Sequence, residues 1–260
     1  MPPDRQPLSA VLITLNAAAQ LPACLDALAF CDEIVVVDSG SSDGTVEVAR
    51  AHGARVIHRD WLGYGPQKQF AVGQAANDWV LCVDADERVT PELRESILGA
   101  VSPRPSQGIP PRITFSAYRF ARCNRFMGRY LRHGEGYPDW SLRLFDRRHA
   151  RWSDDVVHEK VVVDGAVGTL SGDLLHDSAE TLDSYLAKQD RYTTLAAQAA
   201  LAAGKRASLA RQLLSPVVRF IKFYFLRLGL LDGWPGLVHI LIGCRNSHDK
   251  YAKMRRGGMA

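Results

Sequence analysis

The stretch EIVVVDSGSSDGT, residues 33–45, decides the fold. Its apolar residues follow one another without alternation and stop at Asp38, where a loop of Gly, Ser and Asp begins. A continuous apolar strand of this kind is typical of a parallel sheet that is buried on both faces. The stretch therefore predicts an interior strand whose carboxyl end leads into a polar loop.

The segments around this strand alternate between strand and helix patterns. The predicted strands are residues 9–16, 33–38, 54–59 and 78–87, and the predicted helices are residues 21–30, 45–53, 66–76 and 91–101. This alternation predicts an α/β fold with a mixed, mainly parallel sheet flanked by helices. Ligands of such sheets bind beyond the carboxyl ends of the strands, where Asp38, Asp84 and Asp86 are expected.

The pattern changes after residue 101. A loop rich in Pro, Ser and Gly is predicted over residues 102–112, and mixed strands with turns are predicted over residues 113–176. From Ala179 onward the sequence has a helical pattern. We therefore expect an α/β domain over residues 1–178 and a C-terminal helical extension over residues 179–260.

Charge is divided unequally along the chain. Residues 204–260 hold eleven Lys or Arg against two Asp, a net charge of +9, so the rest of a chain whose total is +4 carries −5. Within the basic end, QLLSPVVRFIKFYFLRLGLL (residues 212–231) combines aromatic and leucine side chains with Arg219, Lys222 and Arg227. Three charges near its middle disfavour a membrane-spanning helix.

We expect this segment to lie on a membrane surface instead. Arg219 and Lys222, together with Lys250 and Lys253, would face anionic headgroups while the apolar side chains dip inward. The alternative is an amphipathic helix that packs on the α/β domain. Nucleic acid is not an expected partner, because no recognised nucleic-acid-binding motif accompanies the basic residues.

The cysteines and the N-terminus indicate a reducing compartment. Five cysteines occur at scattered positions without a C-x-x-C pair, which argues against a disulfide framework or a zinc site. Residues 1–16 show no signal-peptide pattern, so we expect the chain to stay in the cytoplasm.

The loop after the strand at residues 33–38 is the first candidate binding site. Asp38 can accept hydrogen bonds from a nucleoside, and the backbone amides of Ser39 to Ser42 suit phosphate or ribose oxygens, because they precede a predicted helix. The alternative is a strand that leads into a capped helix, with Asp43 as its N-cap.

The carboxylates at the end of DWVLCVDADE (residues 78–87) form a candidate metal site. Asp84 and Asp86 are two residues apart, so on an extended strand they share a face and can approach one ligand. Paired carboxylates attract a divalent cation, which can neutralise a diphosphate. A P-loop nucleotidase is excluded because the sequence lacks G-x-x-x-x-G-K-[ST], whereas a solvated strand end stays open as an alternative.

Three further residues carry suitable chemistry. Lys68, near the start of a predicted helix, can meet a phosphate, although a surface lysine is just as common there. In VVHEKVVVDG (residues 156–165), Glu159 can serve as a general base and His158 as a metal ligand or phosphate contact. The alternative for this segment is a β-hairpin with polar surface residues.

Taken together, the motifs resemble the inverting family 2 glycosyltransferases with a GT-A fold. TLN, VVDSGSSDGT and DADE occur in the order of that family's two nucleotide motifs and its D-x-D motif, and the resemblance covers about residues 8 to 165. Further segments resemble the bacterial lipopolysaccharide inner-core β-1,4-glucosyltransferase group. They are RLFDRR (143–148), VHEK (157–160), GLLDGWPGLVH (229–239) and DKYAKMRR (249–256).

The resemblance implies roles for the residues that bind the donor. Thr14, Asn16 and Asp38 would contact the nucleoside, within a nucleotide site that also takes in Ser39 and Lys68. Asp84 would touch the ribose or the diphosphate. Asp86 would bind a divalent metal, Mg²⁺ or Mn²⁺.

The catalytic base is less directly implied. Many members of the family carry a Glu-Asp pair after an arginine-containing strand, and the matching place here holds His158-Glu159. Glu159 is the predicted base. Its rivals are Asp139, Asp154 and Asp155.

The implied reaction is transfer of a sugar, glucose or heptose, with inversion. The donor would be a nucleotide sugar, and the acceptor a lipid-linked glycan such as the lipopolysaccharide inner core at the inner face of the inner membrane. One alternative is a family 2 transferase that acts on exopolysaccharide or polyprenyl-phosphate acceptors. Another is a catalytically inactive, nucleotide-sugar-binding scaffold, against which the three acidic positions argue because a scaffold has no use for crowded like charges.

Overall fold

The computed structural model describes residues 5–102, 115–153, 155, 159–178 and 181–257. The chain divides into two compact units. Unit 1 comprises Met1–Arg122 and Trp140–His176, and unit 2 comprises Cys123–Asp139 and Asp177–Ala260. The sequence pattern placed one division after residue 178 and did not indicate that residues 123–139 belong with the C-terminal helices.

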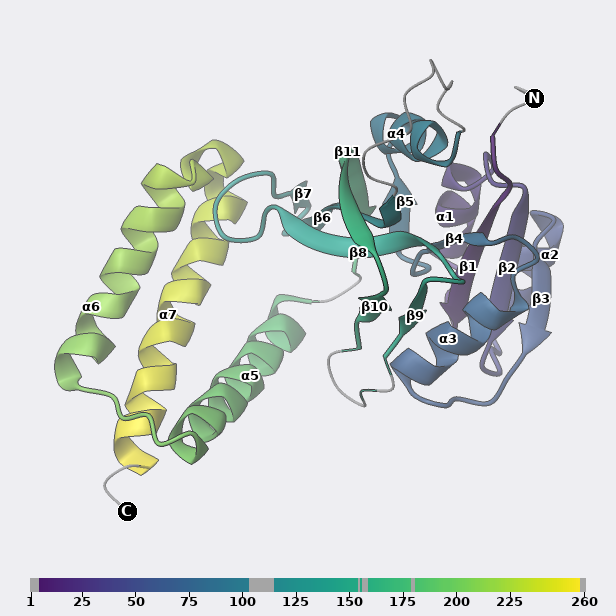
Figure 1. The fold of residues 1–260 in the computed structure, drawn as a ribbon. Helices are drawn as coiled ribbons and strands as arrows, with labels where there is room; N and C mark the ends of the chain where they lie inside the picture. Colours follow the sequence, from purple (N-terminus) through teal and green to yellow (C-terminus); the bar gives the residue numbers. More distant parts are fainter. Residues whose placement is uncertain (1–4, 103–114, 154, 156–158, 179–180, 258–260) are drawn as a thin grey trace. The chain divides into compact units, whose positions relative to one another are not determined.

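Unit 1 is built on a mixed sheet, and its parallel part is made of the strands predicted from the sequence. Strands β1 (Leu8–Thr14), β2 (Glu33–Asp38), β3 (Arg55–His58) and β4 (Trp79–Cys82) lie parallel in the order β3-β2-β1-β4 (Figure 1). The predicted α/β fold is therefore confirmed.

The sheet continues beyond β4 with strands from the second half of the chain. Their order is β8 (Asp139–Asp146), β6 (Phe115–Phe126), β11 (Ala166–His176) and β5 (Glu87–Val89). β8 lies antiparallel to β4, and β5 antiparallel to β11. β9 (Ala150–Trp152) and β10 (Val161–Val163) form a separate antiparallel ribbon, while β7 (Arg129–Tyr130) pairs with β6 in unit 2.

Helices cover both faces of this sheet, which explains its continuous apolar strands. They are α1 (Leu21–Ala27), α2 (Thr45–Ala51), α3 (Tyr64–Gln74) and α4 (Pro91–Val101). Neighbouring strand residues point to opposite faces. Val36 and Leu81 lie in the core beneath α1 and α4, and Val35 and Val80 lie in the core beneath α3.

Unit 2 is mainly helical, as the sequence predicts. Its elements are α5 (Leu182–Ala202), α6 (Leu209–Phe220), the π-helical segment η1 (Ile221–Leu226), the 3-10 segment η2 (Gly229–Asp232) and α7 (Gly233–Gly257). Helix α7 packs against both α5 and α6 (Figure 1). The side chains of Thr181 and Ser208 cap α5 and α6 by accepting hydrogen bonds from the first-turn amides of Ser184 and Arg211.

The five cysteines are free, and four of them are buried. They contribute as small apolar side chains to the cores rather than as cross-links.

Candidate functional site

Asp38 organises the loop at the carboxyl end of β2. Its carboxylate accepts hydrogen bonds from the Thr14 hydroxyl (2.9 Å), the Gly40 amide (3.0 Å) and both the amide and the hydroxyl of Ser41. Burial opposes ionisation of this carboxyl group, which is 2% exposed, but these hydrogen bonds outweigh it and lower the pKa of Asp38 below its ordinary value. The buried carboxylate therefore holds the ends of β1 and β2 in register.

The predicted free amides of Ser39 to Ser42 are a wrong expectation. The Ser39 amide donates to the Thr14 carbonyl (3.0 Å), and the amides of Gly40 and Ser41 donate to Asp38. The Ser42 amide donates to Asn16 Oδ1 (2.9 Å). Three of these four donors bond to the short polar side chains of Asp38 and Asn16, and the Ser39 amide bonds to a backbone carbonyl of β1.

The predicted nucleoside contacts differ in how accessible they are. Thr14 and Asp38 are buried and bonded to each other, whereas Asn16 is exposed and has a left-handed backbone with φ of 52°. Ser39 accepts a hydrogen bond from Gln67 of α3 (3.0 Å), which joins the loop to that helix. Asn16 is therefore the predicted contact that the loop leaves open to a ligand, and the nucleoside role of all four residues stays a prediction.

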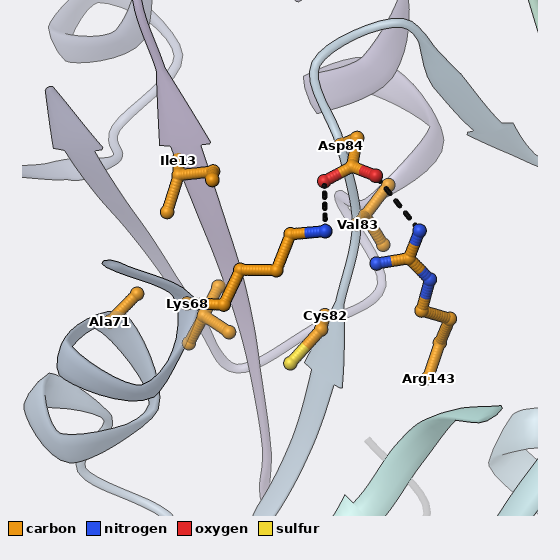
Figure 2. Close-up of a pocket in the computed structure, with 8 residues that line it drawn as sticks. Ile13, Lys68, Ala71, Cys82, Val83, Asp84 and Arg143 are labelled. Atoms are coloured by element: carbon orange, nitrogen blue, oxygen red, sulfur yellow. Dashed lines mark hydrogen bonds and ion pairs between the residues drawn. The ribbon is translucent and has the colours of Figure 1, made fainter. Parts of the chain in front are cut away.

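Asp84, just beyond the carboxyl end of β4, lies between two cations. Lys68 Nζ lies 3.4 Å from one carboxylate oxygen, and Arg143 Nη2 donates to the other at 2.8 Å (Figure 2). Burial raises the pKa of Asp84, but Arg143 and Lys68 act more strongly in the opposite direction, so that its pKa is lowered. The carboxylate is ionised and neutralised by protein groups.

Arg143 links Asp84, whose side chain is partly exposed, to a fully buried carboxyl group. Its Nη2 also lies 3.4 Å from Glu87 Oε1, and Glu87 is fully buried. Burial, together with the neighbouring charge of Asp84, raises the pKa of Glu87 despite the opposing effect of Arg143. Among the described residues, the buried Nη1 of Arg143 has no hydrogen-bond partner. The guanidinium group is thus the centre of a buried charge network.

Arg143→Met is expected to destabilise the protein by about 1–3 kcal/mol, because Asp84 and Glu87 lose their shared hydrogen-bonding cation while Lys68 stays beside Asp84 and Arg122 beside Glu87. Urea denaturation followed by circular dichroism measures this change. Arg50→Met, at an exposed position of α2, is the matched control and should unfold close to the wild-type midpoint. Equal midpoints for the two variants would show that the network does not contribute to stability.

Lys68 does not project freely from the start of α3, as a phosphate-binding lysine would. Its side chain is 9% exposed, lies 4.8 Å from the centre of the Trp152 ring and forms ion pairs with Asp84 and Glu159. Together with Asp84 and Arg143 it lines a small pocket between β1, β4 and α3 (Figure 2). The sequence placed this lysine correctly near a helix start but did not reveal its two carboxylate partners.

Asp84 and Asp86 have different protein partners, and they do not lie on one extended strand as their spacing led us to expect. β4 ends at Cys82, so the two residues lie in the following turn rather than on an extended strand. Asp86 pairs instead with His176 at the end of β11, with Nε2 3.3 Å from its carboxylate. No cluster of three or more His, Cys, Asp or Glu suited to a metal ion occurs in the described part of the chain.

Glu159, the predicted base, lies beside Lys68, with Oε1 3.3 Å from Nζ. Gly65 in α3 permits this approach, because a Cβ atom there would lie 2.5 Å from the Ser153 carbonyl oxygen and 3.3 Å from Glu159 Cβ. The structure therefore brings Glu159, Lys68 and Asp84 together from segments far apart in the sequence.

The other candidates are placed differently. Asp139 belongs to unit 2, where its carboxylate accepts a hydrogen bond from Asn124 (3.4 Å), and Asp155 is exposed in unit 1. His158 and Asp154 lie outside the described residues.

Sequence reasoning missed three residues of the site. Arg143 carries the buried charge network, His176 pairs with Asp86, and Gln67, which is fully buried, bonds to the loop through Ser39. Arg143 lies within the RLFDRR segment, so its position in a buried strand was a usable signal. His176 gave none, because Asp86 is far away in the sequence, and Gln67 gave none for its hydrogen bond to the distant Ser39.

Known proteins are similar in sequence to this chain. The family described as Glycosyl transferase family 2 matches residues 9–160, more than half of the chain. The lipopolysaccharide core biosynthesis glycosyltransferase LpsC of Rhizobium meliloti is 31% identical, with 96% of this chain and 95% of LpsC covered. An uncharacterised glycosyltransferase of Rickettsia typhi is 28% identical over 95% of this chain and 86% of its own.

Solved structures give two further likenesses. S. aureus TarS aligns with 97% of this chain and 91% of its own, at 13% identity and a TM-score of 0.48. Glucosyl-3-phosphoglycerate synthase of Mycobacterium tuberculosis, in complex with Mn²⁺, UDP and glucosyl-3-phosphoglycerate, aligns with 46% of this chain and 44% of its own, at 25% identity and a TM-score of 0.35. From the family match and the similarity to LpsC over nearly the whole of both chains, the protein belongs to glycosyltransferase family 2.

Proposed function

We propose that the protein transfers a hexose or heptose from a nucleotide-sugar donor to the lipopolysaccharide inner core, with inversion at the anomeric carbon. The similarity to LpsC over nearly its full length supports this acceptor class. The observation that carries the proposal is the meeting of Lys68, Asp84, Glu159 and Arg143 beyond the carboxyl end of β4, the edge at which α/β sheets bind their ligands.

The residues present fit a divalent cation that the donor shares. Asp86 and His176 offer a carboxylate oxygen and an imidazole nitrogen, and both side chains are partly exposed, at 29% and 20%. Mg²⁺ commonly takes only one or two protein ligands and completes its coordination with phosphate oxygens and water. When bound, the ion would offset the negative charge that develops on the departing diphosphate.

The neighbouring charges have separate tasks in this proposal. Arg143 and Lys68 hold the Asp84 carboxylate in place from both sides, so that Asp84 can accept hydrogen bonds from the donor without reorganising. Lys68 also positions the carboxylate of Glu159. Because Lys68 is held between two carboxylates, its task is to position them rather than to meet a phosphate directly.

Glu159 is the proposed general base. It would take the proton of the acceptor hydroxyl as that oxygen attacks the anomeric carbon. Attack from the face opposite the departing diphosphate inverts the configuration, through an oxocarbenium-like state of the kind that glycosidases also pass through.

A donor screen tests the proposal. Purified protein is incubated with individual nucleotide sugars, with Mn²⁺ or Mg²⁺, and with lipopolysaccharide acceptors truncated at successive inner-core sugars, and the products are identified by mass spectrometry. We expect release of nucleoside diphosphate and an acceptor heavier by one sugar. Transfer only to polyprenyl phosphate would replace the proposed acceptor, and binding of a donor without any turnover would identify an inactive binding protein.

A further inference from the structure

Helix α6 and segment η1 carry an apolar face that nothing in the described part of the chain covers. None of the residues of α6 or η1 is buried. The large apolar side chains of this face are between 48% and 74% exposed, and they are Leu209, Leu213, Leu214, Val217, Val218, Ile221, Phe225 and Leu226. Their spacing of three to four residues aligns them along one side of the helix. Large exposed apolar patches mark interaction sites.

A basic groove lies beside this α6–η1 apolar face. Its polar lining comprises Arg211, Ser215, Arg219 and Lys222 from α6 and η1, and Ser247 and Tyr251 from α7. Arg211 lies 5.3 Å from the centre of the Tyr251 ring, and Lys222 lies 5.1 Å from that of Phe223. Neither cation forms an ion pair with any residue that the structure describes. The groove thus offers two unneutralised cations, the Tyr251 hydroxyl, and the hydroxyls of Ser215 and Ser247, which share one hydrogen bond of 2.9 Å.

These two features together match one kind of partner. A phosphate group suits the cations and hydroxyls of the groove, while acyl chains suit the adjacent apolar face, and Leu214 and Val218 belong to both surfaces. The +9 charge of residues 204–260 complements an anionic surface. A soluble anion would leave the apolar face unexplained, and an apolar protein partner would leave the cations unexplained.

We propose that unit 2 docks on the anionic surface of a phospholipid bilayer. The α6–η1 apolar face enters the boundary between headgroups and acyl chains, and a lipid phosphate binds in the groove between Arg211 and Lys222. This contact is independent of the sugar-transfer reaction.

The length and composition of the helices of unit 2 bear on whether they could span a membrane instead. No single helix among the described residues has the length and apolar composition to cross a membrane. The segments Leu209–Leu226 and Gly229–Gly257 meet those criteria only as a pair, and they are bent by 75°. The first of these segments also contains the cations Arg211, Arg219 and Lys222, and charges near the middle of a helix disfavour its insertion across a bilayer.

The structure corrects which cations are available to lipid. Arg219 is not free for headgroups, because it forms an ion pair with Glu135. Arg227 donates to the Tyr137 carbonyl (3.0 Å), and Lys253 pairs with Asp190 (2.6 Å). These three residues hold unit 2 together, so their substitution would disturb the fold as well as any lipid contact.

The apolar contribution is tested by flotation with phosphatidylcholine vesicles that contain or lack phosphatidylglycerol. Val218→Asp combined with Leu226→Asp alters two side chains that are 63% and 74% exposed, so the fold should persist. We expect the partition coefficient to fall roughly 100-fold, because two apolar side chains lose their transfer into the interface. Leu195→Asp, at a position of α5 that is 53% exposed, is the matched control and should bind as the wild type does.

The charge contribution is tested with Arg211→Gln combined with Lys222→Gln. At low salt, binding to anionic vesicles should fall roughly 30-fold, and high salt should remove most of the difference between this variant and the wild type. Lys188→Gln combined with Arg191→Gln makes the same change in net charge on α5, and it should have a much smaller effect.

Three results would overturn the proposal. The first is wild-type protein that does not float with anionic vesicles, or variants that bind no differently from their α5 controls. The second is a fraction that resists alkaline carbonate, which indicates a spanning hairpin. The third is a wild-type dimer, detected by light scattering, that is dissociated by Val218→Asp combined with Leu226→Asp while vesicle binding stays unchanged. That result would indicate that a second copy of the chain covers this face. Circular dichroism and donor turnover of each variant verify that it is folded.

Discussion

Asp86→Asn is expected to lower sugar-transfer turnover by about 10³-fold, because the divalent cation that Asp86 would hold supplies several kcal/mol of stabilisation to the departing diphosphate. Asparagine keeps the size of the side chain and one of its oxygens but removes the charge. The variant should also lose Mn²⁺ affinity in the presence of nucleoside diphosphate, which electron paramagnetic resonance of the free ion measures without any turnover.

A second Asp–His pair in unit 1 provides the matched control. Asp26 Oδ1 lies 3.6 Å from His52 Nε2, and these residues lie at the C-terminal ends of α1 and α2. Asp26→Asn should leave both turnover and Mn²⁺ affinity unchanged. If the wild-type enzyme keeps full activity in excess chelator, or if Asp86→Asn binds Mn²⁺ as tightly as the wild type, Asp86 is not a metal ligand.

The parallel part of the sheet could be predicted because its signals are local. β1, β2 and α4 occur within a residue or two of where the sequence pattern places them. A buried strand is predicted from consecutive apolar residues and a helix from their periodic spacing, so neither needs knowledge of distant contacts.

The site was less predictable because its partners are remote in sequence. Lys68 meets Glu159 across 91 positions, and Asp84 meets Arg143 across 59. None of these side chains has a sequence context that indicates its partner, and only the fold shows that Asp84 and Glu159 neutralise Lys68. The amides of Ser39 to Ser42 illustrate the opposite error, since the loop's own side chains compete with any ligand for its donors.

The choice of lipid-facing cations in the basic end needed correction for a related reason. Hydropathy and charge indicated that residues 212–231 hold both apolar and cationic side chains, and the structure shows an exposed apolar face there. Composition could not show which cations have partners. Glu135, the partner of Arg219, lies 84 positions away in a segment whose placement with the helices the sequence did not reveal.

Glu159→Gln is expected to lower transfer by about 10²–10⁴-fold while donor affinity is retained, because glutamine can still accept a hydrogen bond from Lys68 but cannot take up the acceptor proton. Single-turnover measurements with saturating donor give the rate, and calorimetric titration with a non-transferable donor analogue gives the affinity. The acid limb of the pH dependence of kcat/KM should also disappear, because protonation of the base no longer governs the rate.

The pH dependence separates proton transfer from a positioning role for Glu159. If Glu159 served only to hold Lys68 near Asp84, the Gln variant would keep the acid limb and show weaker donor binding instead. Glu95→Gln, at an exposed position of α4, controls for the loss of one negative charge and should behave as the wild type does. If Asp139→Asn abolishes the acid limb and Glu159→Gln does not, the base is Asp139 rather than Glu159.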